Sequence, residues 1–264
     1  MKEKVPMTTN LKTGFIGTGA ITEAMIVGLL NAGSLDPANL SISRRSEQRS
    51  TRLQQQFPDI RELDSNQQIA DDSQWVFVAV LPEQTKAVLQ EIDFDPQTTV
   101  VSLVGGVFVD QIRSYTGCQN VMRIVPLPPV EFGVGPIPIF PPNEPVQTLL
   151  NTVGSSVPLQ QEKDLLVCAS ASALMATYFE EVKQIANWLH QQGLEAASSA
   201  SYASNMLHAL ASTTIDKDLE QLREMSDECL TVGGLNEQVL FQKRQDQWFK
   251  SIDRNLDAIL QRIS

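Results

Sequence analysis

Residues near the start of the chain have the types and spacing that bind a phosphate group. Segment 14–22 reads Gly-Phe-Ile-Gly-Thr-Gly-Ala-Ile-Thr, and its last residue, Thr22, stands where a dinucleotide-binding fingerprint has Gly or Ala. The first glycine of such a turn permits a tight bend, the second lets the backbone approach a pyrophosphate, and the following helix offers free N–H groups. The turn predicts a dinucleotide site, with a purely structural glycine turn as the alternative. The expected cofactor-binding residues here are Gly17, Thr18, Gly19, Ala20 and Ile21.

The end of the second β-type run indicates which dinucleotide would bind. Domains that bind NAD place Asp or Glu there to bond the ribose hydroxyls. In this chain the run ends in Ser43, Arg44, Arg45 and Ser46, with no acid. Guanidinium groups form forked, charge-assisted hydrogen bonds to phosphate oxygens. These four residues therefore predict NADP(H) rather than NAD(H), against the alternative of two solvated arginines at a strand end.

Short β-type runs alternate with helical patterns up to about residue 159. We expect strands at 13–16, 40–43, 75–80, 99–104 and 121–125. We expect helices at 21–31, 47–57, 82–92 and 109–115. Strands that are apolar throughout are buried on both faces, as in a parallel sheet covered by helices. The pattern predicts an α/β Rossmann-type N-terminal domain at residues 1–159, with a mostly parallel, doubly wound sheet.

The second half of the sequence reads as helical. After residue 125, the Pro- and Gly-rich segments 126–129 and 133–136 are predicted to form neither central strands nor helices, and 137–139 reads as an edge strand before a helix at 144–152. Further helices are expected at 163–191, 198–210, 218–227 and 236–263, the first of them ended by Gly193. The prediction is an all-α C-terminal domain at residues 160–264. Its core would be small, so we expect it to pack against a second copy.

Composition excludes several classes of protein. The formal net charge of −11 argues against nucleic acid and anionic membrane surfaces as partners. The three cysteines, Cys118, Cys168 and Cys229, are far apart and predict neither a disulfide framework nor a metal site, with Cys168 expected to be a buried apolar residue. The N-terminus lacks the apolar core of a signal peptide, and the longest apolar run, at 165–176, reads as too short for a membrane span. We expect a cytoplasmic protein.

Several segments together resemble the pyrroline-5-carboxylate reductase family. Segment 14–24 is similar to the family's opening, and 79–82 (Ala-Val-Leu-Pro) resembles its Ala-Val-Lys-Pro. At matched spacings, 102–107 (Ser-Leu-Val-Gly-Gly-Val) resembles Ser-x-x-Ala-Gly-Ile, and 123–126 (Arg-Ile-Val-Pro) resembles Arg-x-Met-Pro. The likeness covers nearly the whole chain and is best in the first half. It implies these additional cofactor contacts: Asn66, Ala79, Val80, Leu81, Pro82 and Gly105.

The substrate-side motifs of that family are altered here. Leu127 and Pro128 replace the family's Asn-Thr, and 170–176 keeps only the two serines of Ser-Gly-Ser-Gly-Pro-Ala-Tyr. Segment 232–236 reads Val-Gly-Gly-Leu-Asn where the family has Pro-Gly-Gly-Thr-Thr, whose threonines help to hold the substrate carboxylate. The substrate-binding residues that the resemblance implies are Ser170, Ser172, Gly233, Gly234, Leu235 and Asn236. It also implies a homodimer through interleaved C-terminal helices, with a higher oligomer left open.

The resemblance implies reduction of a cyclic imine by NADPH, with pyrroline-5-carboxylate as substrate and proline as product. A protonated imine is already an electrophile, so the protein mainly has to align it with the nicotinamide. The sequence identifies no catalytic residue, and neither His190 nor His208 stands out as a proton donor. The altered pocket leaves two alternatives. One is an NADP-dependent reductase or dehydrogenase of a different imine, ketone or β-hydroxy acid on the same scaffold, and the other is a non-catalytic NADP-binding dimer that acts as a sensor or scaffold.

Overall fold

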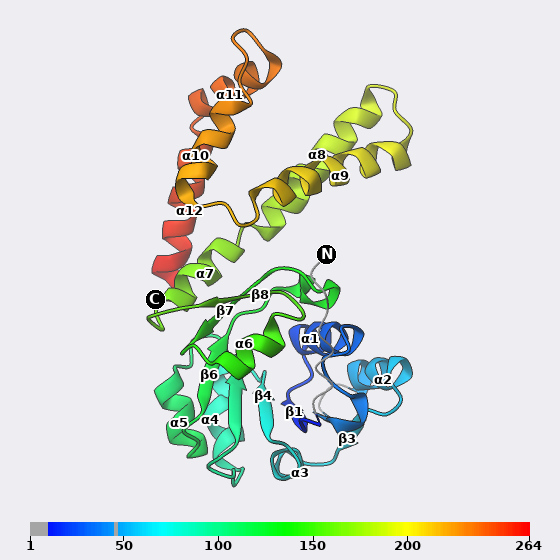
Figure 1. Cartoon of the computed structure of the whole chain (residues 1–264), viewed down its shortest axis with the longest axis vertical. Coiled ribbons are helices and arrows are strands. Elements are labelled where there is room, and N and C mark those ends of the chain that lie inside the picture. The colour runs from blue at the N-terminus through cyan, green and yellow to red at the C-terminus, as the bar shows by residue number, and fades with distance from the viewer. Residues whose placement is uncertain (1–9, 45–46) are drawn as a thin grey trace. The chain divides into compact units, whose positions relative to one another are not determined.

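The computed structural model of the chain describes residues 10–44 and 47–264. Arg45 and Ser46, both expected at the cofactor, lie outside the described residues. The chain divides between Ala169 and Ser170 into two compact units (Figure 1).

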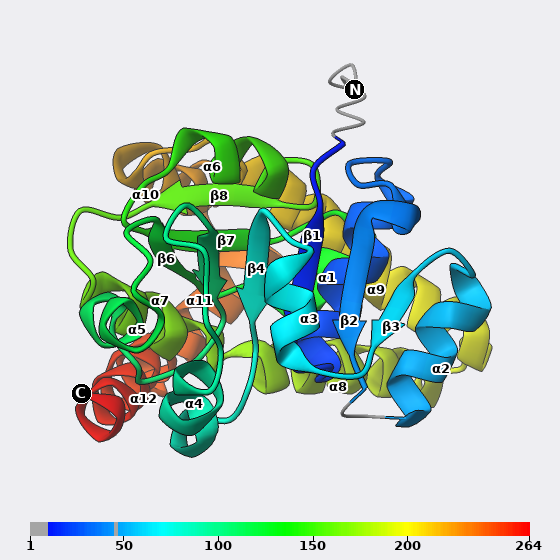
Figure 2. The same ribbon diagram turned by 90° about the horizontal axis from the view of Figure 1, so that it is seen from below.

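The first unit is built on a single sheet in the order β3-β2-β1-β4-β5-β6-β7-β8 (Figure 2). The strands are β1 Thr13–Ile16, β2 Leu40–Ser43, β3 Arg61–Leu63, β4 Trp75–Val78, β5 Thr99–Ser102, β6 Val121–Ile124, β7 Pro136–Phe140 and β8 Ser155–Pro158. Neighbouring strands are parallel except β6 and β7, which are antiparallel. The predicted Rossmann-type α/β fold with a mostly parallel sheet is confirmed.

Helices connect the strands of this sheet. They are α1 Ala20–Asn31, α2 Glu47–Gln56, α3 Asn66–Asp71, α4 Pro82–Gln90, α5 Val109–Thr116 and α6 Glu144–Leu150, with short 3-10 helices η1 Pro37–Asn39 and η2 Pro128–Phe132. The expected strands and helices up to residue 125 are confirmed to within two residues at each end. Four elements were not predicted, namely β3, β8, α3 and the short η1. The η2 turn begins at Pro128 and Pro129, in a segment that was expected to contain no helix.

Burial on both faces of the sheet follows from the alternation of side chains along each strand. Phe15 and Phe77 stack with ring centroids 4.7 Å apart in an apolar cluster that includes residues of α1. Ile16, Val76 and Val78 point to the opposite face and join a second cluster, with residues of α3, α4 and α5. The continuous apolar strands of the sequence are thus explained, because successive residues enter different cores.

The assignment of 137–139 to an edge strand was wrong, because β7 lies between β6 and β8. Its two prolines, Pro136 and Pro138, are two residues apart and therefore direct their missing N–H groups to the same neighbour. That neighbour is β6, since Val125 N donates to Pro138 O at 3.1 Å, and β6 pairs with β7 at only two residue pairs. The other side of β7 keeps its N–H groups and pairs with β8 over four residues.

The second unit consists of helices. The chain enters it through α7 Asp164–Ser172 and continues with α8 Met175–Gln191, α9 Ala196–Thr214, α10 Leu219–Glu228, α11 Leu235–Gln245 and α12 Trp248–Ile263. The expected helix 163–191 is in fact two, because i→i−3 hydrogen bonds tighten the chain at Ala173 and Leu174. The expected helix 236–263 is also two, broken where Gln247 adopts a left-handed conformation with φ of 53°. Gly193 follows α8 with φ of 104°, as predicted for a residue that ends a helix.

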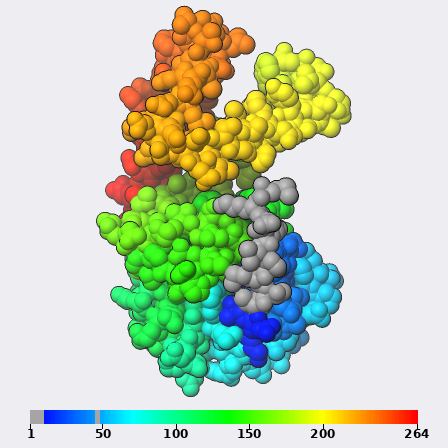
Figure 3. Space-filling model, viewed as in Figure 1, coloured from blue at the N-terminus to red at the C-terminus, as the bar shows by residue number. Residues whose placement is uncertain are grey.

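The helices of the second unit bury few side chains. None is buried in α8, α10, α11 or α12, and α9 buries only Ser199 and Ala203. The α8–α9 hairpin, yellow in Figure 3, exposes Phe179 and Trp188 by 62% and 59%. Segment Asp164–Gln191 also has the length and composition of a membrane span, so the apolar run is longer than the sequence suggested. An interface helix of a water-soluble protein has the same character, so this one segment is weak evidence for a membrane.

Candidate functional site

The order of the strands creates the crevice in which a ligand would bind. The chain runs from β1 outward to β2 and β3, and then returns to place β4 on the other side of β1. At such a switch point the loops after the two central strands separate, and a crevice opens at the carboxyl ends of the strands. Here those loops are residues 17–19 after β1 and 79–81 after β4, which together line a cavity of about 230 Å³.

The glycine at position 17 allows these two loops to approach each other. Gly17 has φ of 96°, a conformation that L-residues with a side chain rarely adopt. A Cβ atom on it would lie 2.4 Å from Ala79 O and 2.8 Å from Ala79 C. Only a residue without a side chain fits between the backbone of β1 and the loop after β4.

A short network ties the turn to the end of β2. Gly17 N donates to Ser43 Oγ at 2.9 Å, and Thr18 Oγ1 donates to Ser43 O at 2.7 Å. Both hydroxyl-bearing residues are buried, so these bonds are protected from water. Ser43 therefore has a structural task in addition to any contact with a ligand, because it holds the turn in the conformation that faces the crevice.

The first turn of α1 is left open for an anion. Gly19 is the N-cap of α1, and no side chain caps the helix there. A Cβ atom on Gly19 would meet nothing within 4 Å, and Gly19 lines the cavity. An uncapped helix N-terminus behind a glycine offers N–H donors and positive potential to a phosphate group. The residues of this turn thus fit a dinucleotide pyrophosphate.

A second cavity, of about 430 Å³, continues from the first along the ends of β2 and β3. It shares Gly17 and Val80 with the first and is also lined by Ser43, Arg44, Asp64 and Asn66. Arg44 is paired with two acids: its Nε lies 3.2 Å from Glu62 Oε1, and its Nη1 lies 3.6 Å from Asp64 Oδ1. The sequence shows no acid at the end of β2, but the structure supplies Glu62 from β3 and Asp64, the residue that follows this strand. They were missed because β3 itself was not predicted.

Most of the expected cofactor contacts meet at these two cavities. The residues that line them are Gly17, Thr18, Gly19, Ser43, Arg44, Asn66, Ala79, Val80 and Leu81. Those that do not line either cavity are Ala20, Ile21, Pro82 and Gly105. The lining also includes residues that the sequence did not single out, namely Ile16, Leu63, Asp64, Ser65, Gln84 and Val88. Of these, Ser65 is recognisable in retrospect as the N-cap of α3, where its hydroxyl accepts from Gln68 N.

The expected substrate residues lie in two places in the second unit. Gly233 and Gly234 line a cavity of about 360 Å³ at the start of α11, whereas Ser170 and Ser172 on α7 do not line it. Leu235 and Asn236 also do not line this cavity, and Leu235 is 83% exposed.

The turn before α11 already carries a carboxylate of the chain itself. Glu237 Oε2 accepts a hydrogen bond from Gly233 N at 2.7 Å. Asn236, which was expected to donate to a substrate, instead donates from Nδ2 to Cys229 O at 3.1 Å. Of the two glycine N–H groups before the altered threonine positions, that of Gly233 is therefore bonded to an internal acid, and that of Gly234 donates to Thr231 O at 2.7 Å.

No nucleophile or metal site emerges from the described residues. No group of three or more His, Cys, Asp or Glu side chains in them is arranged to hold a metal ion. Burial raises the pKa of the Cys118 thiol, an effect that the hydrogen bond with Thr116 partly offsets, so this residue is the inert buried cysteine. Cys168 was expected in that role but is only half-buried. His190 Nδ1 lies 2.8 Å from Leu194 O after the end of α8, which is a structural contact.

Comparison with known proteins finds relatives of this chain. A family model described as NADP oxidoreductase coenzyme F420-dependent matches residues 12–106. A pyrroline-5-carboxylate reductase of Corynebacterium melassecola is 30% identical over 172 residues, which is 60% of this chain and 63% of that protein. A pyrroline-5-carboxylate reductase of Vibrio alginolyticus is 24% identical over 263 residues, 95% of this chain and 96% of that protein.

A solved structure agrees with these relatives in fold. The crystal structure of Plasmodium falciparum pyrroline carboxylate reductase with NADP bound is 18% identical, covers 97% of each chain and gives a TM-score of 0.81. The chain is therefore similar to pyrroline-5-carboxylate reductases in sequence and in fold, and its residues 12–106 match a family of NADP oxidoreductases.

Proposed function

We propose that this chain reduces a cyclic imine with NADPH, and that its substrate is pyrroline-5-carboxylate, which becomes proline. The observation that carries the proposal is the open glycine turn at the switch point, where the uncapped start of α1 faces the loop after β4. The likeness to pyrroline-5-carboxylate reductases along 95% of the chain supports the choice of substrate. We assign cofactor binding to residues 1–159, and substrate binding and dimerisation to residues 160–264.

In the proposed reaction the protein mainly has to bind NADPH and the imine and to align them. NADPH would supply the hydride, and the imine carbon would accept it. The turn at Gly17 and Gly19 would hold the pyrophosphate, and the ends of β2 and β3 would hold the adenosine. Leu81, which is 56% exposed at the start of α4, would present an apolar surface to the reacting end of the cofactor. Such alignment of the two reactants can account for a large part of a rate enhancement.

The direct test is oxidation of NADPH by the purified chain in the presence of pyrroline-5-carboxylate, followed by absorbance. We expect turnover that is faster with NADPH than with NADH. If NADPH binds but no imine or ketone oxidises it, and no β-hydroxy acid reduces NADP+, the protein is a non-catalytic NADP-binding protein and the proposal is overturned.

A second candidate function is reduction of a cyclic imine that carries no carboxylate. The observation that favours it is Glu237, whose carboxylate accepts the hydrogen bond of Gly233 N. A bound carboxylate needs such donors, and a nearby acid repels it. The two functions are distinguished by comparing the turnover of pyrroline-5-carboxylate with that of 1-pyrroline, which is the same ring without the carboxylate. Faster turnover of 1-pyrroline, together with a gain for pyrroline-5-carboxylate in Glu237→Gln, would establish the second function.

Cofactor preference is expected to depend on the charges around Arg44. Arg44→Ala should weaken the binding of NADPH by about 10-fold and the binding of NADH much less, because a charged hydrogen bond to the extra phosphate contributes about 1.5–3 kcal/mol. Asp64→Asn should do the opposite and strengthen NADPH a few-fold, because it removes an anion that competes for the same guanidinium. Dissociation constants from NADPH and NADH fluorescence titrations measure both effects. Equal changes for the two cofactors in either variant would contradict this role.

We also propose that the chain is a cytoplasmic homodimer formed through its C-terminal helices. The exposed apolar side chains of the second unit support this, because they leave its helices without a core of their own. We expect light scattering to give twice the mass of one chain, and the mass of a single chain would contradict the proposal.

A further inference from the structure

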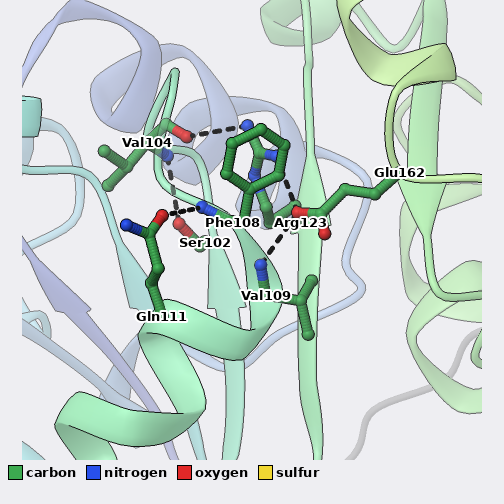
Figure 4. Close-up of polar contacts among 7 residues, drawn as sticks. All are labelled: Ser102, Val104, Phe108, Val109, Gln111, Arg123 and Glu162. Atoms are coloured by element: carbon green, nitrogen blue, oxygen red, sulfur yellow. Dashed lines mark hydrogen bonds and ion pairs between the residues drawn. The ribbon is translucent and has the colours of Figure 1, made fainter.

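A buried ion pair lies in the first unit, outside the two cavities of the crevice. Arg123, on β6, is 3% exposed, and its Nη1 donates to Glu162 Oε1 at 2.7 Å. Glu162 lies in the segment between β8 and α7, and the same oxygen accepts from Val109 N at 2.8 Å (Figure 4). Val109 is the first residue of α5, whose N-cap side chain makes no hydrogen bond of the usual kind. One carboxylate therefore neutralises Arg123 and satisfies a free N–H at the start of α5.

The same arginine holds the loop between β5 and α5. Its Nη2 donates to Val104 O at 3.4 Å, and its guanidinium lies 5.5 Å from the centre of the Phe108 ring. Val104 N in turn donates to Ser102 Oγ at 3.1 Å. The loop is thus fixed at both ends by contacts that converge on Arg123 and Glu162 (Figure 4).

This loop stands at the edge of the sheet where the cofactor crevice opens. Strand β5 is parallel to β4, with Ser102 beside Val78, and Leu103 N donates to Val78 O at 2.8 Å. Residues 103–108 therefore follow directly alongside residues 79–81, which line the first cavity. Gly105 and Gly106 are exposed in the middle of the loop, and Gly106 has φ of 72°. A loop with two glycines has little stiffness of its own, so its position depends on the contacts at its ends.

We propose that Arg123 and Glu162 are positioning residues of the reaction, which hold loop 103–108 in place beside the reacting end of the cofactor. The inference rests on the proposed function, because it assumes that the imine and nicotinamide meet at this edge. Stability alone does not explain a buried ion pair, because apolar residues of similar volume often stabilise a protein as well as the pair does, or better. Apolar replacement of both residues therefore separates the two roles.

The experiment compares Arg123→Met, Glu162→Met and the double variant. Each single variant leaves one buried charge unpaired and should lower the melting temperature. The double variant should regain most of that loss but keep a kcat that is lower by about 100-fold, as expected for a misplaced reacting group. The dissociation constant for NADPH should change by less than about 3-fold, since most of the binding contacts lie elsewhere. Asp110→Asn is the matched control, because it removes the same charge from an exposed position on α5 and should leave kcat unchanged.

Hydrogen exchange provides a readout that does not depend on activity. In the double variant the amides of Val104 and Val109 should lose protection, while those of β4 and β5 keep it. If the double variant does not fold, Glu162→Gln keeps the shape and one acceptor oxygen, and should give smaller changes of the same kind. A double variant with restored stability, unchanged exchange in 103–109 and a normal kcat would overturn the proposal. If the unaltered protein turns over no imine, the proposed function fails, and unchanged exchange is then the result that overturns the positioning of the loop.

Discussion

Gly17→Ala is expected both to weaken NADPH binding strongly and to destabilise the first unit. The new Cβ atom would lie 2.4 Å from Ala79 O, in a residue whose φ of 96° suits only glycine. Backbone strain and overpacking each cost about 1–3 kcal/mol, so the free energy of unfolding should fall by roughly 3–5 kcal/mol. The loop after β4 has to move to relieve the contact, and NADPH should bind at least about 100-fold more weakly, which corresponds to about 2.7 kcal/mol. Thermal unfolding and fluorescence titration with NADPH measure the two effects.

Gly19→Ala is the control for this prediction. Its Cβ atom would meet no other atom within 4 Å, and φ is −84°. The free energy of unfolding should therefore change by no more than about 1 kcal/mol, the usual cost of an unfavourable N-cap. The methyl group would nevertheless occupy the cavity beside the start of α1, and NADPH should bind more weakly. Normal NADPH binding by Gly19→Ala would mean that the pyrophosphate does not lie on this turn.

Gly28→Ala is expected to destabilise the protein strongly, although the residue lies inside a helix. Alanine in place of glycine normally stabilises a helix interior by about 0.5–1 kcal/mol. Here a Cβ atom would lie 2.3 Å from Val130 O, because α1 packs closely on the backbone of η2. The clash should outweigh the gain and lower the free energy of unfolding by about 2–4 kcal/mol. Chemical denaturation measures the change in the free energy of unfolding. A decrease for Gly28→Ala supports the close contact between α1 and η2, and an increase contradicts it.

Gly33→Ala provides the comparison, since Gly33 follows α1 with φ of 69° and open space around its Cβ position. Gly33→Ala should lower the free energy of unfolding by about 1–2 kcal/mol, because alanine is unfavourable in this left-handed conformation. A stabilising Gly28→Ala, or one that is milder than Gly33→Ala, would contradict the close packing of α1 on η2.

The strands that were predicted correctly are those whose own apolar residues indicate that they are buried. Strands such as β1 and β4 are apolar throughout, because both faces are covered, and this pattern is visible without a structure. Strand β3 has the sequence Arg-Glu-Leu at the edge of the sheet, and β8 is mostly exposed at the other edge. An edge strand needs neither apolar faces nor a long run, so neither could be read from its composition.

The same reasoning explains what was missed at the cofactor site. The glycine turn and the loop at 79–81 carry recognisable residue types, whereas Asp64 and Glu62 become relevant only when β3 is placed beside β2. The interruptions in the long helices are also set by local geometry. Neither Leu174 nor Gln247 is a glycine or proline, and nothing in their residue types marks a break.

The uneven distribution of buried side chains along the chain has a consequence for its synthesis. The first 169 residues contain both apolar clusters, whereas the helices that follow bury almost none of their side chains. Domains generally fold as units in the order in which they leave the ribosome. The nucleotide-binding unit can thus complete its core while the rest of the chain is still being made. The helices emerge last, and in the proposed homodimer their apolar faces stay exposed until a second chain covers them. We expect the protein to depend most on chaperones during this interval.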